Sequence, residues 1–143
     1  MKLNINNLNM EQKVIICDYA LSNKSGTMYF TPMNTNIAAG YIDNEPKDGS
    51  YLVNITTIDE FCKLNNIKPN FIKMDIEGAE LDAIIGSKST ILEYKPKLAI
   101  CIYHRFSHRW EIPLLIHEIL PEYKFYIKKS QPRGETVLFC IAD

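Results

Sequence analysis

The sequence lacks the short motifs by which several common classes of binding site are recognised. None of its six glycines belongs to a GxGxxG or GxG loop, the kind of loop that cradles cofactor phosphates at a helix N-terminus. Its four cysteines include no CxxC pair. This spacing argues against a zinc site or a disulfide framework, and it favours reduced cysteines in the core.

Long apolar runs and an excess of one charge are also missing. No run approaches the roughly 20 apolar residues that a membrane-spanning helix needs, and the polar first residues do not resemble a signal peptide. The 16 basic and 17 acidic residues give a net charge of -1, so no long-range field favours nucleic acid or anionic lipid. We therefore expect one soluble cytoplasmic domain over residues 1–143, with neither nucleic acid nor membrane as a partner.

The chain does contain alternating strand and helix patterns. Proline and glycine punctuate residues 31–50 and predict a long irregular loop there, while Thr57 and Glu60 match the S/T-x-x-E capping box at a helix start. The expected strands are residues 14–17, 27–30, 52–55, 71–76, 97–103, 123–128 and 136–141, and the expected helices are residues 58–65, 80–85 and 111–120. This order predicts an α/β fold with a mostly parallel sheet and an antiparallel hairpin at its C-terminal edge.

Three carboxylates stand where the strand of residues 71–76 ends and the next helix begins. That end of an open α/β sheet is where ligands bind. Strand alternation would point Asp75 and Glu77 to the same side, and Gly78 would allow a sharp turn. Glu80 is equally typical of a helix start, and Asp75 of a loop cap, so general-base catalysis is one of two interpretations.

A second polar cluster follows the next parallel strand. His104 could act as a base near neutral pH or bind an anionic or hydroxyl-bearing substrate. His104 and His108 have a spacing that a metal could use on a helix, but they lie in a predicted loop without a third ligand, so no metal site is expected. Arg105 is either a surface charge or a substrate clamp. Asp18, Ala20 and Leu21 could line a nucleotide base or simply end a strand.

Four blocks of residues, taken together and in order, resemble the FkbM family of S-adenosylmethionine-dependent methyltransferases. The most specific is Lys73-x-Asp75-x-Glu77-Gly78-x-Glu80, and the other blocks are residues 57–60, 102–113 and 135–139. The resemblance extends from about residue 14 to residue 139. It implies a class I, Rossmann-like sheet and methyl transfer to a hydroxyl oxygen of a sugar or another small molecule.

The resemblance also implies roles for particular residues. Asp18, Ala20 and Leu21 would lie near the adenine of S-adenosylmethionine. Asp75, Glu77 and His104 would line the methyl-transfer site, with Asp75 also contacting the cofactor. A carboxylate or an imidazole there would accept the proton of the acceptor hydroxyl as its oxygen attacks the methyl group.

The family pattern further implies two strands and a glycine-rich turn that would precede Met1, so we expect an N-terminally incomplete sheet. The strand of residues 71–76 would then expose an apolar edge. Residues 14–17, a second copy of the chain or an upstream polypeptide could cover it, and a homodimer is the testable form of this expectation. The alternative function is that of a non-catalytic α/β remnant or interaction module. A metal-dependent hydrolase using Asp75 and Glu77 has less support.

Overall fold

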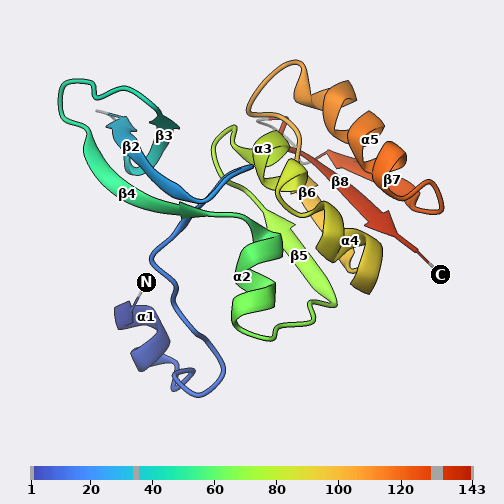
Figure 1. Ribbon diagram of the computed structural model, residues 1–143, viewed down its shortest axis with the longest axis horizontal. Coiled ribbons are helices and arrows are strands. Elements are labelled where there is room, and N and C mark those ends of the chain that lie inside the picture. The colour runs from blue at the N-terminus through green and yellow to red at the C-terminus, as the bar shows by residue number, and fades with distance from the viewer. Residues whose placement is uncertain (1, 34–35, 130–133, 143) are drawn as a thin grey trace.

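The computed structural model of the protein describes residues 2–33, 36–129 and 134–142, and they form a mixed α/β fold with two four-stranded sheets (Figure 1). The first sheet has the strand order β1-β4-β2-β3 and the second β5-β6-β8-β7. The strands are β1 Ala20–Leu21, β2 Gly26–Met33, β3 Asn36–Asp43, β4 Tyr51–Thr56, β5 Phe71–Met74, β6 Lys97–Cys101, β7 Lys124–Lys129 and β8 Thr136–Ile141. The helices are α1 Lys2–Asn7, α2 Ile58–Leu64, α3 Glu80–Ile85, α4 Lys88–Tyr94 and α5 His108–Ile119.

The core lies between the second sheet and its helices. Strand β6 is buried along four of its five residues, as expected for an apolar run at the centre of a sheet. Helix α3 packs against α5, and α4 packs against both α2 and α5. The largest fully buried apolar side chains include Met74, Ile84, Ile91, Leu98, Ile100, Ile102, Ile112, Ile116 and Leu138. One continuous apolar cluster therefore fixes α3 and α5 relative to β5 and β6.

The second sheet agrees with the predicted topology better than the first does. Strands β5 and β6 are parallel, and β8 and β7 continue the sheet in antiparallel pairing, so the predicted C-terminal hairpin is confirmed. The prediction of a mostly parallel sheet is wrong for the described residues. Of their six strand pairings, β1–β4 and β5–β6 are parallel and the other four are antiparallel.

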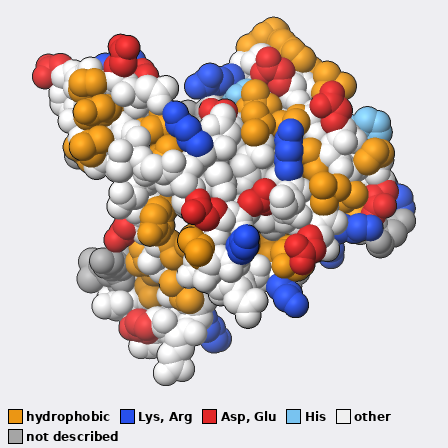
Figure 2. Space-filling view, viewed as in Figure 1, with side chains coloured by type: hydrophobic (Ala, Val, Ile, Leu, Met, Phe, Trp, Pro, Cys, Tyr) orange, Lys and Arg blue, Asp and Glu red, His pale blue; other side chains and the backbone are white. Residues whose placement is uncertain are grey.

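Residues 14–17 form no strand, contrary to the prediction. They belong to an extended segment that leads from α1 toward β1, where Val14 and Ile15 are 37% and 87% exposed. Figure 2 shows hydrophobic side chains on the surface over this part of the molecule. An apolar run becomes a strand only where another backbone pairs with it. Parallel pairing instead begins at Ala20, opposite Ile55 of β4.

The predicted loop over residues 31–50 is also wrong, because β3 occupies much of it. Strand β3 pairs with β2, Pro32 stands opposite Gly40, and the register shifts immediately after Pro32. A Cβ atom on Gly40 would lie 2.3 Å from Cζ of Phe30 and 2.6 Å from the carbonyl oxygen of Thr31. Gly40 therefore marks a close approach within a sheet rather than a turn. Residues 34 and 35 lie outside the described part.

The three predicted helices are present as α2, α3 and α5, but the structure differs from the prediction at three points, the first being α1 Lys2–Asn7, which was not among the expected helices. Helix α4 was not predicted, since residues 88–94 carry no separate start signal; the N-cap residue Ser87 makes no side-chain capping bond. Helix α5 begins at His108, three residues before the predicted start at residue 111, so that Pro113 lies inside the helix. The polar cluster predicted to lie in a loop after β6 is therefore partly helical, because His108 is already the first residue of α5.

Strand β5 lies at one end of its sheet and, among the described strands, pairs with β6 alone. Phe71 at its start is 53% exposed. An apolar edge is therefore present where it was expected. Pairing of this edge with a second copy of the chain stays a prediction, as do the single partial domain over residues 1–143 and the cytoplasmic location. Within the described ranges, none of the helices is both long and apolar enough to span a bilayer.

The capping box at α2 gives a first testable prediction. Thr57 has an extended backbone, and its Oγ1 accepts a hydrogen bond of 3.0 Å from the backbone N–H of Glu60. Thr57→Ala should lower the free energy of unfolding by about 1 kcal/mol, measured by urea denaturation, because one helix N–H loses its partner. Thr57→Ser keeps the hydroxyl and is the control. Equal losses in both variants would contradict a capping role.

Candidate functional site

The site lies where β5 and β6 end side by side. Met74 is in register with Ile100, so the residues that follow the two parallel strands meet at one edge of the sheet. Strand β5 stops at Met74, two residues earlier than predicted. Glu77 then adopts a φ of 56° and Gly78 a φ of 101°, so the predicted sharp turn at Gly78 is confirmed.

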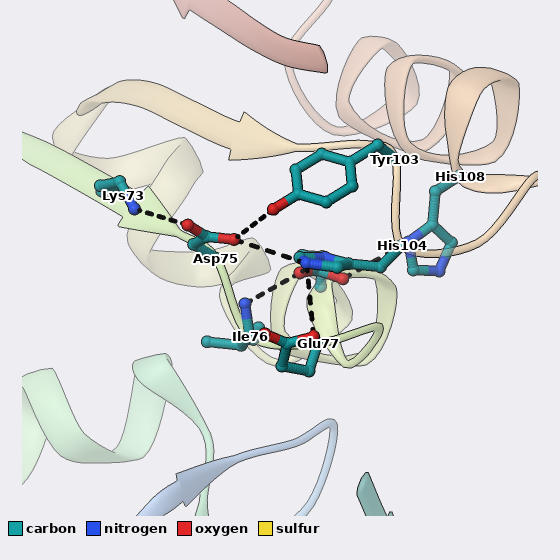
Figure 3. A network of polar contacts seen from close by, with 8 residues as sticks. Lys73, Asp75, Ile76, Glu77, Tyr103, His104 and His108 are labelled. Atoms are coloured by element: carbon teal, nitrogen blue, oxygen red, sulfur yellow. Dashed lines mark hydrogen bonds and ion pairs between the residues drawn. The ribbon is translucent and has the colours of Figure 1, made fainter. Parts of the chain in front are cut away.

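His104 stands at the centre of a polar cluster, shown in Figure 3. Its Nδ1 lies 2.7 Å from Oε1 of Glu80, and its Nε2 lies 3.5 Å from Oδ1 of Asp75 and 3.7 Å from Oε2 of Glu77. The His104 side chain is 8% exposed and that of Glu80 is fully buried. The structure thus brings together Asp75, Glu77 and His104, the three residues expected to line a methyl-transfer site.

Glu80 ties the turn to the histidine. Besides approaching His104, its Oε1 accepts a hydrogen bond of 2.9 Å from the backbone N–H of Ile76. The Glu80 carboxylate accepts hydrogen bonds from both the backbone N–H of Ile76 and the ring of His104. A proton on Nδ1 of His104 is therefore favoured, and the other ring nitrogen, Nε2, faces Asp75 and Glu77. This arrangement resembles the histidine–carboxylate pairs in which the carboxylate orients the ring.

Asp75 is held in its ionised form by donors on several sides. Tyr103 donates its hydroxyl to Oδ1 at 3.3 Å, and Nζ of Lys73 lies 3.3 Å from Oδ2. Burial alone would raise the pKa of Asp75, but hydrogen bonds from Cys101, Lys73 and Tyr103 lower it below its ordinary value. Burial and the nearby Asp75 raise the pKa of Tyr103 to about 12. Asp75 is therefore a carboxylate at neutral pH and Tyr103 a proton donor to it.

A cavity of about 440 Å³ opens beside this cluster, within the size range of small-molecule sites. Asp75, Glu77 and Gly78 line it from the β5 turn, and Ala20 and Leu21 line it from β1. Strands β2 and β3 close another side, with Phe30, Tyr41 and Ile42 among the lining residues. Asp18, the remaining residue expected near a nucleotide, instead lines a neighbouring cavity with Glu60 and Phe61.

Sequence reasoning undervalued two residues of the site. Glu80 was interpreted as a helix-start carboxylate as readily as a catalytic one. Its complete burial and its contact with His104 became evident only in the fold. His108 was expected in a loop, but it is the first residue of α5, it is 1% exposed, and its Nδ1 lies 3.4 Å from Oε2 of Glu80.

Two buried thiols of the second sheet, Cys101 beside the site and Cys140 in the core, give a pH prediction. Burial raises the pKa of Cys101, assisted by its hydrogen bond to Asp75, and burial raises that of Cys140, each to about 12 from an ordinary value of 9.0. Above pH 9 the unfolded chain therefore loses these protons first, so the free energy of unfolding should fall between about pH 9 and pH 12. Cys140→Ala should reduce this slope in urea titrations. Cys17→Ala, at an exposed position, is the control, and an equal effect there would contradict the assignment.

The expectation of no metal site stays a prediction. No group of three or more histidine, cysteine, aspartate or glutamate side chains in the described ranges is arranged to hold a metal ion.

The fold and the site together define an α/β domain with a small-molecule cavity at the ends of parallel strands. The family model described as the methyltransferase FkbM domain matches residues 1–127. The chain belongs to this family, and the resemblance found in the sequence is confirmed.

Two relatives place the chain more closely. It is 33% identical over 79 residues to the hexuronic acid methyltransferase AglP of Haloferax volcanii. The matched residues make up 54% of this chain and 32% of that protein. The crystal structure of methyltransferase FkbM from Methylobacillus flagellatus KT superposes with a TM-score of 0.72 and 27% identity, covering 96% of this chain and 31% of that one. The chain thus shares its mixed α/β fold with an FkbM methyltransferase and spans about a third of the length of either relative.

Proposed function

We propose that this chain contributes a methyl-transfer site, as part of a longer methyltransferase domain, that moves a methyl group from S-adenosylmethionine to a hydroxyl oxygen of a small, sugar-like molecule. The observation that carries the proposal is the placement of His104. Its Nδ1 is held by the buried Glu80, and its Nε2 faces Asp75 and Glu77, which border the cavity.

The residues around the cavity fit the proposed cofactor in charge and in polarity. S-adenosylmethionine, when bound, supplies an electrophilic methyl group on a positively charged sulfur. The carboxylates of Asp75 and Glu77 favour a cation beside them, and Ala20 and Leu21 offer a small apolar surface for the adenine. Asp18 lines a different cavity, so the adenine contact in this proposal rests on Ala20 and Leu21.

The acceptor hydroxyl must lose its proton as its oxygen attacks the methyl group, and we assign that proton to His104. Its ring does not itself line the cavity, but its Nε2 lies 3.5 Å from Asp75 and 3.7 Å from Glu77, which do. A ring that donates through Nδ1 to Glu80 has its lone pair on Nε2. The Glu80 carboxylate then stabilises the imidazolium that forms. Asp75, kept ionised by its donors, can accept a hydrogen bond from a second group of the acceptor.

Arg105 favours an acidic acceptor. It is the sole cationic side chain among the described residues lining the cavity. Its guanidinium group packs against Gly78: a Cβ atom added to that glycine would lie 3.0 Å from Nε of Arg105. Guanidinium groups bind carboxylates through two parallel hydrogen bonds. A sugar acid would present its carboxylate to Arg105 and a hydroxyl to His104. The name of the Haloferax volcanii relative, a hexuronic acid methyltransferase, supports the same class of acceptor.

The test combines binding and transfer. Calorimetric titration of S-adenosylmethionine and its demethylated product into the chain should give a saturable heat. Transfer of labelled methyl from the cofactor should be faster to glucuronic acid than to glucose, and Arg105→Gln should remove this preference. Arg109→Gln, which alters an arginine stacked on Phe106 outside the cavity, is the matched control.

Two results would speak against the proposal. The absence of heat at millimolar cofactor would favour a non-catalytic α/β module for this chain. Equal transfer rates to glucuronic acid and glucose would contradict an acidic acceptor while leaving methyl transfer intact. Membership of the methyltransferase family and the intact polar cluster favour transfer over the non-catalytic alternative.

A further inference from the structure

Two buried polar atoms face each other without a hydrogen bond. Oε2 of Glu80 and Nδ1 of His108 are among the few buried side-chain atoms in the described ranges that lack a partner, and they lie 3.4 Å apart. Buried polar groups in native proteins are nearly always paired, so each exception requires a physical explanation. A shift of a few tenths of an ångström would join these two atoms in a hydrogen bond.

The position of this pair connects it to the site. Glu80 begins α3 and His108 begins α5, two helices that pack against each other. Figure 3 shows the His104 ring between Asp75 on one side and His108 on the other. Because Oε1 of Glu80 already holds His104 and the backbone of Ile76, its Oε2 is the atom left for His108.

The surroundings of His108 favour a neutral ring. Burial lowers its pKa below the ordinary value of 6.5, against the opposing charge of Glu80. The charged or titratable groups facing it are Glu80 from α3, His104 and Arg105 from the segment between β6 and α5, and Glu111 from α5 itself. A neutral imidazole carries one N–H group, and only a proton on Nδ1 can be donated to Glu80.

We infer that His108 is a positioning residue that donates from Nδ1 to Oε2 of Glu80, so that one buried carboxylate holds both histidines and fixes the ring of His104. The importance of this contact for methyl transfer rests on the function proposed above. The contact between His108 and Glu80 itself requires neither cofactor nor acceptor, so it can be tested in the unliganded chain.

Removal of the donor would act on His104 through Glu80. A buried carboxylate with one oxygen unpaired is costly. The chain can relieve that cost if Glu80 takes up a proton or turns its side chain toward water. In the first case Oε1 of Glu80 remains only as a weaker, neutral acceptor for His104, and in the second case that acceptor is lost. Either change makes the ring of His104 freer to carry the proton on either nitrogen.

Nitrogen NMR of the histidine side chains tests the inference without cofactor or acceptor. The chain has three histidines, and the exposed His117 serves as the internal reference. We expect His104 and His108 each to carry a proton on Nδ1, and the pKa of His108 to lie below the ordinary value for histidine because its ring is buried. A proton on Nε2 of His108 in the unmodified chain would overturn the inference, whatever any variant does.

Two substitutions sharpen the test. His108→Asn places an amide donor near the position of Nδ1, whereas His108→Leu fills similar space without a donor. The Nδ1-protonated form of His104 should persist in the first and give way to a mixture in the second. In the labelled-methyl assay, His108→Leu should lower kcat by about 10- to 100-fold with little change in KM, as for other groups that orient a histidine, and His108→Asn should restore it.

The outcomes separate this inference from the proposed function. An unchanged His104 tautomer in folded His108→Leu protein would overturn the inference. If His108→Leu protein does not fold, the tautomer of His108 in the unmodified chain still decides it. Normal tautomers in a chain that transfers no methyl group would uphold the positioning contact and count against the proposed function instead.

Discussion

Replacing Ile84 with alanine should lower the free energy of unfolding by about 2–5 kcal/mol. Ile84 lies in α3, is fully buried and belongs to the main apolar cluster with Ile112 and Ile116 of α5. The substitution removes three carbons from a packed interior and leaves a cavity that the surrounding helices can fill only in part. Urea denaturation followed by circular dichroism measures the loss.

The next residue supplies a matched control. Ile85 has the same side chain in the same helix but is 37% exposed, so Ile85→Ala should cost about 1 kcal/mol or less. Equal losses at the two positions would contradict the packing of α3 against α5. The comparison also bears on the site, because the same helix carries Glu80 at its first residue.

The second sheet was predictable because its strands carry their signals locally. Residues 71–76, 97–103 and 136–141 are mostly apolar stretches of strand length, a pattern typical of buried strands, and β5, β6 and β8 occur there. Residues 14–17 have a similar composition but form no strand. What differs is the presence of a paired neighbour, and no local pattern reveals whether one exists.

The missed strand β3 illustrates the opposite error. Pro32 and Gly40 are strong turn signals, yet they stand opposite each other in the β2–β3 pairing. Gly40 is needed there because the Phe30 ring occupies the space of a side chain. Glycine and proline report that the backbone is unusual at a position. They do not say whether the cause is a turn or a crowded sheet.

The site was predictable to the extent that it depends on strand ends. Asp75, Glu77 and His104 follow two parallel strands, and the topology alone brings them together. Glu80 and His108 depend on how α3 packs against α5, which decides that a helix-start carboxylate is buried and that a histidine faces it. Such contacts join residues from separate elements, and the spacing of residues along the chain does not encode them directly.

The largest effect on activity is expected from His104→Asn, which should lower kcat of methyl transfer by about 10²- to 10⁴-fold, the usual contribution of a general base. This corresponds to about 3–5 kcal/mol of activation free energy. The asparagine amide can occupy the position of Nδ1 and keep the hydrogen bond to Glu80. The atom that disappears is Nε2, the nitrogen that faces Asp75 and Glu77.

This substitution separates catalysis from folding. Because the contact with the buried Glu80 is retained, the free energy of unfolding should change much less than the rate does. His117→Asn, at an exposed histidine of α5, is the matched control and should leave kcat unchanged. If His104→Asn transfers methyl groups at a rate within about threefold of the unmodified chain, His104 is not the base. The carboxylates of Asp75 and Glu77, which lie beside it and line the cavity, would then be the remaining groups in the cluster placed to take the proton.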